Sequence, residues 1–180
     1  MKIKVILFLM LISGSLSAQR LISKTSHVWF YSHTAMEDIE AHNRQAVSIL
    51  DSQTGDIQFS LLIKSFEFKV ALMQEHFNEN YMESEKFPKA GFKGKITNLD
   101  QINFSKDGVY KAMVTGELTI HGVSKELTTE GTIDVINGKV SSKAKFNVTP
   151  SDFDIAIPAV VENKIAKNIE ITVEADYNQN

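Results

Sequence analysis

The side chains of this sequence that could do chemistry are its histidines and its closely spaced carboxylates. Such groups bind zinc when several of them converge, and a run of them begins at His33 and ends at His42. The run has no H-E-x-x-H motif and the chain has no cysteine, so the spacing matches no standard metal site. We interpret it as a solvated acidic loop and expect no metal. The histidines are His27, His33, His42, His76 and His121, and the carboxylates of the run are Glu37, Asp38 and Glu40.

A second candidate is the carboxylate pair Asp152 and Asp154, which flanks Phe153 and could act as an acid and a base. A polar outward face next to Pro150 explains this pair more simply. His121 precedes a glycine in a turn, where its ring is expected to bond turn backbone. The chain contains no G-x-S-x-G elbow, phosphate loop or dinucleotide fingerprint. We therefore predict no catalytic residue and no cofactor.

The composition is that of one globular domain, with 180 residues of which 43% are apolar. A formal net charge of −3 gives no reason to expect nucleic acid as a partner. Because no disulfide can form, a hydrophobic core must hold the domain together.

The first residues have the layout of a secretory signal peptide. Lys2 and Lys4 precede an apolar run, and small residues end at Ser17 and Ala18. The apolar run is shorter than the roughly 20 residues that a permanent transmembrane helix needs. We expect a signal peptide over 1–18, a domain over 19–180, and a periplasmic or secreted protein without a membrane span.

From Leu21 onward, apolar and polar residues alternate, as in GELTIHGVSKELTTEGTI from Gly116 to Ile133. This alternation is typical of strands with one buried face. The pairs Asn137-Gly138 and Asp107-Gly108 are two-residue hairpin signals, and residues 51–55 and 121–125 indicate longer hairpin loops. The pattern predicts strands, mostly joined by short antiparallel connections, at 21–31, 43–50, 56–64, 90–98, 109–121, 126–136, 139–148 and 167–177.

One segment has helical spacing instead. Val70, Met73, Phe77 and Tyr81 recur on one side of a helix, with polar residues on the other side. Pro88 ends what precedes it. We predict a short helix over 69–80, between the third and fourth strands and across one end of the sheet.

Eight such antiparallel strands can form either a closed barrel or a two-sheet sandwich. Small residues at Gly94, Gly116, Gly131 and Ser142 share the parity of the inward side chains. They would leave room inside a barrel, although glycines also mark bends. The inward set is Ile57, Phe59, Leu61, Ile63, Phe92, Ile96, Ala112, Val114, Leu118, Ile120, Leu127, Ile133, Val135, Val140, Ala144, Phe146, Val148, Ile169, Ile171 and Val173.

Three ordered motifs resemble the YceI-like proteins. The first is ALMQEHFNENYMESEKFPKAGFKGKI from Ala71 to Ile96, and the second is the GELTIHGVSK hairpin that begins at Gly116. The third is the ending FNVTPSDFDIAIPAVVENKIAKNIEITVEADY, in which an aromatic segment and a Pro-Ala turn lead into the last strand. Where the family usually has an Arg-Asp pair before the motif histidine, this chain has Met73, Gln74 and Glu75.

The resemblance implies an exported, all-β, lipocalin-like barrel of eight antiparallel strands around a long isoprenoid or other lipid chain. We expect the partner to be a long-chain isoprenoid or fatty-acid-like ligand, held by apolar walls without a charged anchor. The expected walls are Phe59, Leu61, Phe92, Val114, Leu118, Ile133 and Phe146, with Phe77, Tyr81 and Phe87 as a lid.

Two other classes stay open. An enzyme would place two converging titratable groups inside the cavity. A surface interaction protein would have a filled barrel and would use the segment from Met36 to Glu40 as its contact. A homodimer could form through an edge strand or through the helix face.

Overall fold

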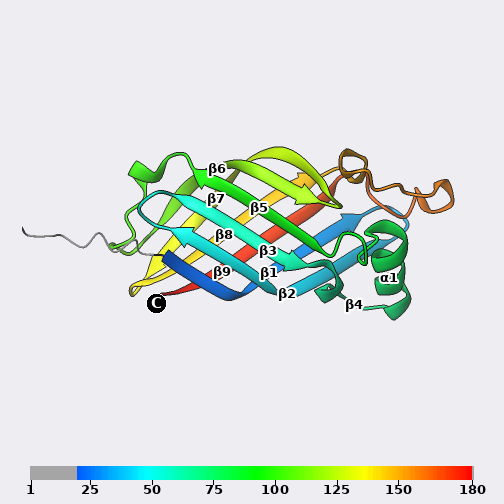
Figure 1. The fold of residues 1–180 in the computed structure, drawn as a ribbon, viewed down its shortest axis with the longest axis horizontal. Helices are drawn as coiled ribbons and strands as arrows, with labels where there is room; N and C mark the ends of the chain where they lie inside the picture. The colour runs from blue at the N-terminus through cyan, green and yellow to red at the C-terminus, as the bar shows by residue number, and fades with distance from the viewer. Residues whose placement is uncertain (1–19, 180) are drawn as a thin grey trace, which may run out of the picture.

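The computed structural model describes residues 20–179, so the expected signal peptide over 1–18 lies outside the described residues. Eight long antiparallel strands close into a barrel, and one short helix lies at one end of it (Figure 1). This confirms the predicted fold class. The long strands are β1 (Arg20–His33), β2 (Asp38–Asp51), β3 (Asp56–Leu62), β5 (Lys89–Ile96), β6 (Gly108–Ile120), β7 (Val123–Ile136), β8 (Lys139–Val148) and β9 (Ile169–Gln179).

Each long strand pairs with the strands next to it in the chain, which is the up-and-down barrel arrangement. The two-residue strand β4 (Glu67–Phe68) was not predicted. It pairs only with Ala41 and His42, near the start of β2. Closure comes from β1, which pairs with both β2 and β9. Every long strand therefore has two partners, and the edge-strand dimer contact considered from the sequence has no long strand available.

The β1–β2 pair explains why no inward set could be assigned to these two strands from their sequence. Ser23 pairs with Ser48, but Ser26 pairs with Ala46, so β1 carries one extra residue. The register then returns at Val28, because β2 carries an extra residue in turn. A β-bulge reverses the side-chain alternation of a strand. A strict alternation of inward and outward side chains therefore fails on β1 and β2.

The two longest connections, residues 63–88 and 149–168, lie at one end of the barrel, called the mouth end below, together with two short turns. The two turns are residues 34–37 and the β6–β7 turn, and the first long connection contains the helical segment after β4. Figure 1 shows the helix and the orange 149–168 segment together at this end, opposite the C-terminus. The helical segment is α1 (Ala71–His76) continued by a π-helical turn (Phe77–Tyr81), which agrees with the predicted helix over 69–80.

Two of the predicted turns differ from the structure. Asn137 and Gly138 both have positive φ and form the expected two-residue turn, and His121 and Gly122 do the same. Strand β7 therefore begins at Val123, and no long loop over 121–125 exists. The Asp107-Gly108 hairpin prediction is wrong, because residues 97–107 form an irregular connection that includes a short 3₁₀ turn (Leu99–Gln101).

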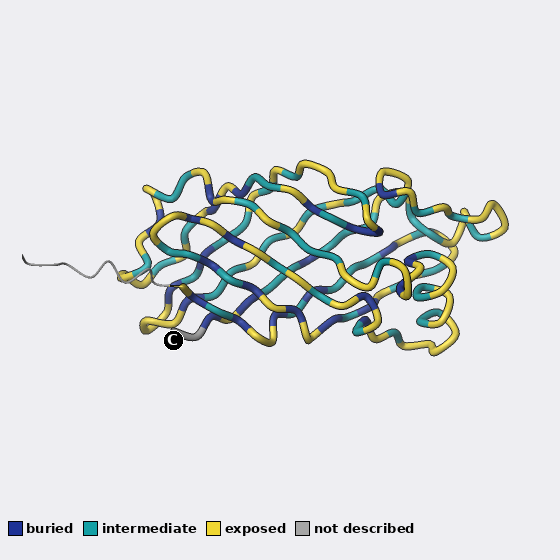
Figure 2. The backbone as a smooth tube through the Cα atoms, viewed as in Figure 1, coloured by how far each residue is buried: buried dark blue, intermediate teal, exposed yellow. Residues whose placement is uncertain are grey.

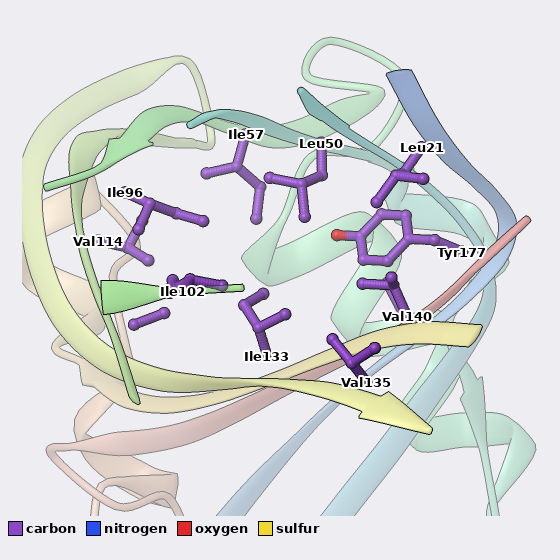
Figure 3. Packing of buried hydrophobic residues seen from close by; sticks show 12 residues of the cluster. Leu21, Leu50, Ile57, Ile96, Ile102, Val114, Ile133, Val135, Val140 and Tyr177 are labelled. Atoms are coloured by element: carbon purple, nitrogen blue, oxygen red, sulfur yellow. The ribbon is translucent and has the colours of Figure 1, made fainter. Parts of the chain in front are cut away.

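A core cluster fills the other end of the barrel, called the closed end below. Ile102, from the 97–107 connection, reaches into its centre and packs among strand residues such as Leu50 and Ile133 (Figure 3). The Tyr177 hydroxyl lies 2.8 Å from Ser48 Oγ and 3.1 Å from Ser142 Oγ, which satisfies its polar atom inside this cluster. Burial raises the pKa of the Tyr177 phenol, so the group is a neutral hydrogen-bonding partner. The cluster closes this end with packed side chains.

Candidate ligand-binding cavity

The barrel encloses a cavity of about 550 Å³ between the closed-end cluster and the mouth. The walls come from all eight long strands, from the helical segment and from residues 149–168. Ile96, Ile133 and Ser142 border its inner limit, and the exposed residues Leu72 and Lys164 border its outer limit. The cavity is therefore a blind pocket that opens at the mouth end.

The inward parity predicted from the sequence is confirmed by the placement of the side chains. All of the predicted inward residues line the cavity or belong to the closed-end cluster. Inward residues near the closed end are buried, whereas Phe59, Phe92 and Phe146 are only half-buried. Figure 2 shows buried and half-buried positions interspersed with exposed ones along the strands. An inward aromatic side chain keeps accessible surface only where the space in front of it is empty. The barrel is therefore not filled by its own side chains, as it would be in a protein that binds only through its surface.

Of the ten predicted ligand-contacting residues, all but Phe87 border the cavity. The structure brings together the expected wall residues from five strands, with Phe77 and Tyr81 across the mouth. These nine residues are Phe59, Leu61, Phe77, Tyr81, Phe92, Val114, Leu118, Ile133 and Phe146.

Phe77 fixes the helical segment to the barrel wall. Its ring centroid lies 5.5 Å from that of Phe30, 5.5 Å from that of Phe66 and 5.0 Å from that of Phe68. Aromatic pairs at these separations add stabilisation beyond their buried area. Phe30 and Val28 also border the cavity, and the sequence analysis missed both because of the bulge on β1. The part of β1 after the bulge alternates regularly up to the exposed residue His33, so the alternation counted back from His33 would have placed Phe30 and Val28 on the inward face.

Phe87, which was expected in the lid, does not border the cavity, and its ring packs on His121. The centroids of the two rings are 4.4 Å apart, in an edge arrangement. His121 Nδ1 lies 3.0 Å from the Phe153 carbonyl oxygen, and its Nε2 lies 2.9 Å from Glu83 Oε2. His121 was expected to bond the backbone of its own turn, but its partners are the backbone of Phe153, in a distant segment, and the side chain of Glu83. This buried contact ties the segment after the helix, the β6–β7 turn and residues 150–153 to one another.

Glycines let β5 and β6 approach closely beneath the Phe92 ring. Gly94 pairs with Gly116, and a Cβ atom on Gly116 would lie 2.3 Å from the Lys93 carbonyl oxygen. A Cβ atom on Gly94 would lie 2.5 Å from the tip of the Phe92 ring. These two glycines serve backbone approach and ring packing, and neither of them borders the cavity. The empty space lies in front of the Phe92 ring.

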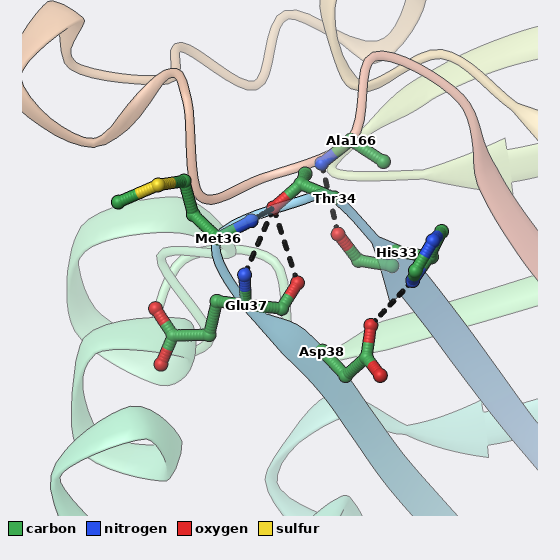
Figure 4. Close-up of polar contacts among 7 residues, drawn as sticks. His33, Thr34, Met36, Glu37, Asp38 and Ala166 are labelled. Atoms are coloured by element: carbon green, nitrogen blue, oxygen red, sulfur yellow. Dashed lines mark hydrogen bonds and ion pairs between the residues drawn. The ribbon is translucent and has the colours of Figure 1, made fainter.

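The polar groups near the mouth are paired with one another. Glu37 and Lys164 form an ion pair of 3.7 Å between the 34–37 turn and the 149–168 segment. The Ala166 backbone N–H donates to Ser32 Oγ, and Thr34 Oγ1 accepts from the N–H groups of Met36 and Glu37 (Figure 4). These contacts hold the turn in place, and both members of the ion pair border the pocket at its mouth.

Of the groups considered for metal or acid–base chemistry, Glu37 and His76 border the cavity at the mouth end, and the others do not line it. Asp152 and Asp154 are exposed, and His33 pairs with Asp38 at 2.6 Å on the outer surface. Strand β2 begins at Asp38, so the acidic loop predicted from His33 to His42 is only a 34–37 turn. Among residues 20–179, no three side chains converge as a metal site would require. In the same part of the chain, no helix is long and apolar enough to cross a bilayer.

Comparisons with known proteins agree with this architecture. The YceI-like domain family matches residues 20–177. A polyisoprenoid binding domain from Saccharophagus degradans, implicated in plant cell wall breakdown, has a similar structure, with a TM-score of 0.76 at 12% identity over 91% of this chain and 99% of that chain. BcnA from Burkholderia cenocepacia has a TM-score of 0.70 at 17% identity, over 85% of this chain and 96% of that chain. A Campylobacter jejuni YCEI protein has a TM-score of 0.59 at 20% identity, over 82% and 90%.

A search of curated protein sequences gives no match. At these identities the solved structures show a common fold. The family match spans nearly all of the described residues and covers every strand that walls the cavity. The chain therefore belongs to the YceI-like domain family.

Proposed function

We propose that this protein holds one long-chain isoprenoid or fatty-acid-like lipid, with its tail inside the barrel and its head group at the mouth. The observation that carries the proposal is the blind apolar pocket of about 550 Å³. A concave, mostly apolar site of this size, with its few polar groups near an opening, suits such a ligand. The polyisoprenoid-binding description of the Saccharophagus degradans domain supports the same ligand class.

The volume limits the length of the tail. One water-sized group takes up about 30 Å³ of liquid volume, so the pocket accepts roughly eighteen such groups. Each buried methylene contributes about 0.8 kcal/mol, so a tail that fills the pocket gains about 14 kcal/mol before ordering and association costs. No charged contact is needed for micromolar or tighter binding.

The role in the cell that we propose is carriage, storage or sequestration of this lipid outside the cytoplasm. It rests on the signal-peptide pattern of residues 1–18, which favours export to the periplasm or beyond. The titratable pair that borders the pocket, Glu37 and Lys164, is an ion pair at the mouth, and most of the lining side chains are apolar, which favours a binding protein over an enzyme.

The direct test is to extract the purified protein with organic solvent and to identify the released compounds by mass spectrometry. We expect a compound with a long apolar tail. Binding of a dansyl-labelled fatty acid to the extracted and refolded protein gives the second readout. A protein that releases no lipid and binds no labelled fatty acid contradicts the proposal.

A matched pair of variants on β5 assigns the binding to the cavity. Phe92→Asp places a carboxylate on the cavity wall, and Lys93→Asp places the same group on the exposed outer face. Desolvating an unpaired carboxylate is costly, so we expect Phe92→Asp to weaken binding about tenfold or more and Lys93→Asp to leave it unchanged. If Phe92→Asp does not fold, Leu127→Asp on β7 tests the same wall. Equal binding by the interior and exterior variants would show that the lipid is held elsewhere.

A further inference from the structure

Large apolar side chains remain exposed around the mouth of the pocket. Their exposed fractions are 65% for Met36, 45% for Val70, 57% for Leu72 and 86% for Val160. They come from three separate segments: the 34–37 turn, the start of α1 and the short helical turn Ala159–Val161. Together these four residues are called the rim below. A group of exposed apolar residues contributed by several segments is typical of an interaction surface.

The rim is continuous with the pocket. Two rim residues, Val70 and Leu72, also line the cavity. The other two, Met36 and Val160, are followed in the chain by the lining residues Glu37 and Val161. The Glu37–Lys164 ion pair joins the segments of Met36 and Val160. Figure 4 shows the Met36 side chain projecting from the turn, away from the paired His33 and Asp38. A surface that touches the rim therefore also covers the pocket opening.

The charges near the rim are mixed. Lysines and glutamates occur together on the rim segments, so no basic patch is available to attract anionic lipid head groups. Binding of the rim to a lipid surface would therefore depend on burial of its apolar side chains. The charged residues are Lys69, Lys164, Lys167, Glu37, Glu75 and Glu162.

We propose that the rim docks this protein on the surface of a neutral lipid bilayer, with the pocket opening against the membrane. This inference rests on the proposed function. A tail that crosses water is fully exposed, and each exposed methylene makes that transfer about fourfold less favourable. A rim that enters the head-group region lets the tail pass between bilayer and pocket without that exposure.

The test is co-sedimentation of the full mature chain with phosphatidylcholine vesicles. The test variant is the double substitution Met36→Asp and Val160→Asp, which changes two rim residues that do not border the cavity. The matched control is Val109→Asp and Ile136→Asp, at residues 70% and 59% exposed near the closed end. We expect the wild type and the control to bind vesicles equally and the rim variant to bind about tenfold less.

Salt and a soluble ligand separate the alternatives. Binding by the rim should be the same at roughly 0.1 M and 0.5 M salt, because no ion pair with the lipid is involved. The rim variant should still bind a dansyl-labelled fatty acid from solution, so loss of docking and loss of the pocket are distinguishable. Equal vesicle binding by the rim variant, a strong loss of binding at high salt, or a protein dimer that the rim variant abolishes would each overturn the membrane assignment.

Discussion

Ala144→Phe on β8 should shorten the longest tail that the pocket accepts. Ala144 borders the cavity between Ser142, at the inner limit, and Phe146. It is only half-buried despite its small side chain, which indicates empty space in front of it. Replacing its methyl group with a benzyl group adds six carbon atoms to the wall. These carbons project into the void that the tail would fill.

The size of the effect follows from the cavity volume. At about 30 Å³ for each water-sized group, six carbons remove about 180 Å³, or about a third, of the 550 Å³ pocket. Affinity should rise about fourfold for each added methylene until the pocket is full and should then level off. We expect that plateau near eighteen carbons in the wild type and near twelve in Ala144→Phe, by the same volume estimate.

The assay is displacement of a dansyl-labelled fatty acid by a series of saturated fatty acids of increasing length. Asn147→Phe is the matched control, because Asn147 is an exposed residue of the same strand. It should keep the wild-type plateau. If Ala144→Phe lowers the melting temperature too far, Ala144→Leu adds three carbons and should move the plateau half as far. An unchanged plateau in a folded Ala144→Phe or Ala144→Leu protein would refute the assignment of this void to the tail.

Other predictions concern the framework around the pocket. Gly116→Val should lower the free energy of unfolding in urea by about 1–3 kcal/mol, because its Cβ would lie 2.3 Å from the Lys93 carbonyl oxygen; an unchanged midpoint would contradict this. His121→Asn tolerates the positive φ but loses the Glu83 contact, so amide hydrogen exchange in residues 77–87 should accelerate, with no change at β1. Partial burial lowers the pKa of His27, and the Arg44 and His42 charges lower it further. Because the folded-state pKa is below the unfolded value of about 6.5, stability should be complete above that pH and should fall as the pH drops through the window beneath it. His27→Gln should flatten that part of a melting-temperature profile, and a profile identical to the wild type would contradict the assignment.

The barrel could be predicted from the sequence because most of its strands obey strict alternation. From β3 to β9, every residue assigned to the interior by parity lies in the cavity or in the closed-end cluster. The Asn137-Gly138 turn was equally readable, since both residues favour positive φ. These features depend on residues close together in the chain. Local sequence is sufficient for them.

The parts that could not be predicted depend on distant partners. The bulges on β1 and β2 are defined only by the pairing of those two strands, and they hid the inward positions of Val28 and Phe30. Phe87 was assigned to the lid together with Phe77 and Tyr81. Its real position depends on His121, which lies in another hairpin and contacts Glu83 as well. No pattern within the 81–90 segment reports on such a contact.

The residues that wall the pocket are also the framework of the fold. The walls resist collapse because every long strand is hydrogen-bonded on both sides and because packed side chains fill the closed end. At the mouth, the Phe77 ring contact with Phe68 and the His121 contact with Glu83 fix the helical segment and the residues after it to the barrel. A lipid that binds the folded barrel and not the unfolded chain stabilises the fold by mass action, so lipid binding and folding stability are expected to be coupled through the same walls.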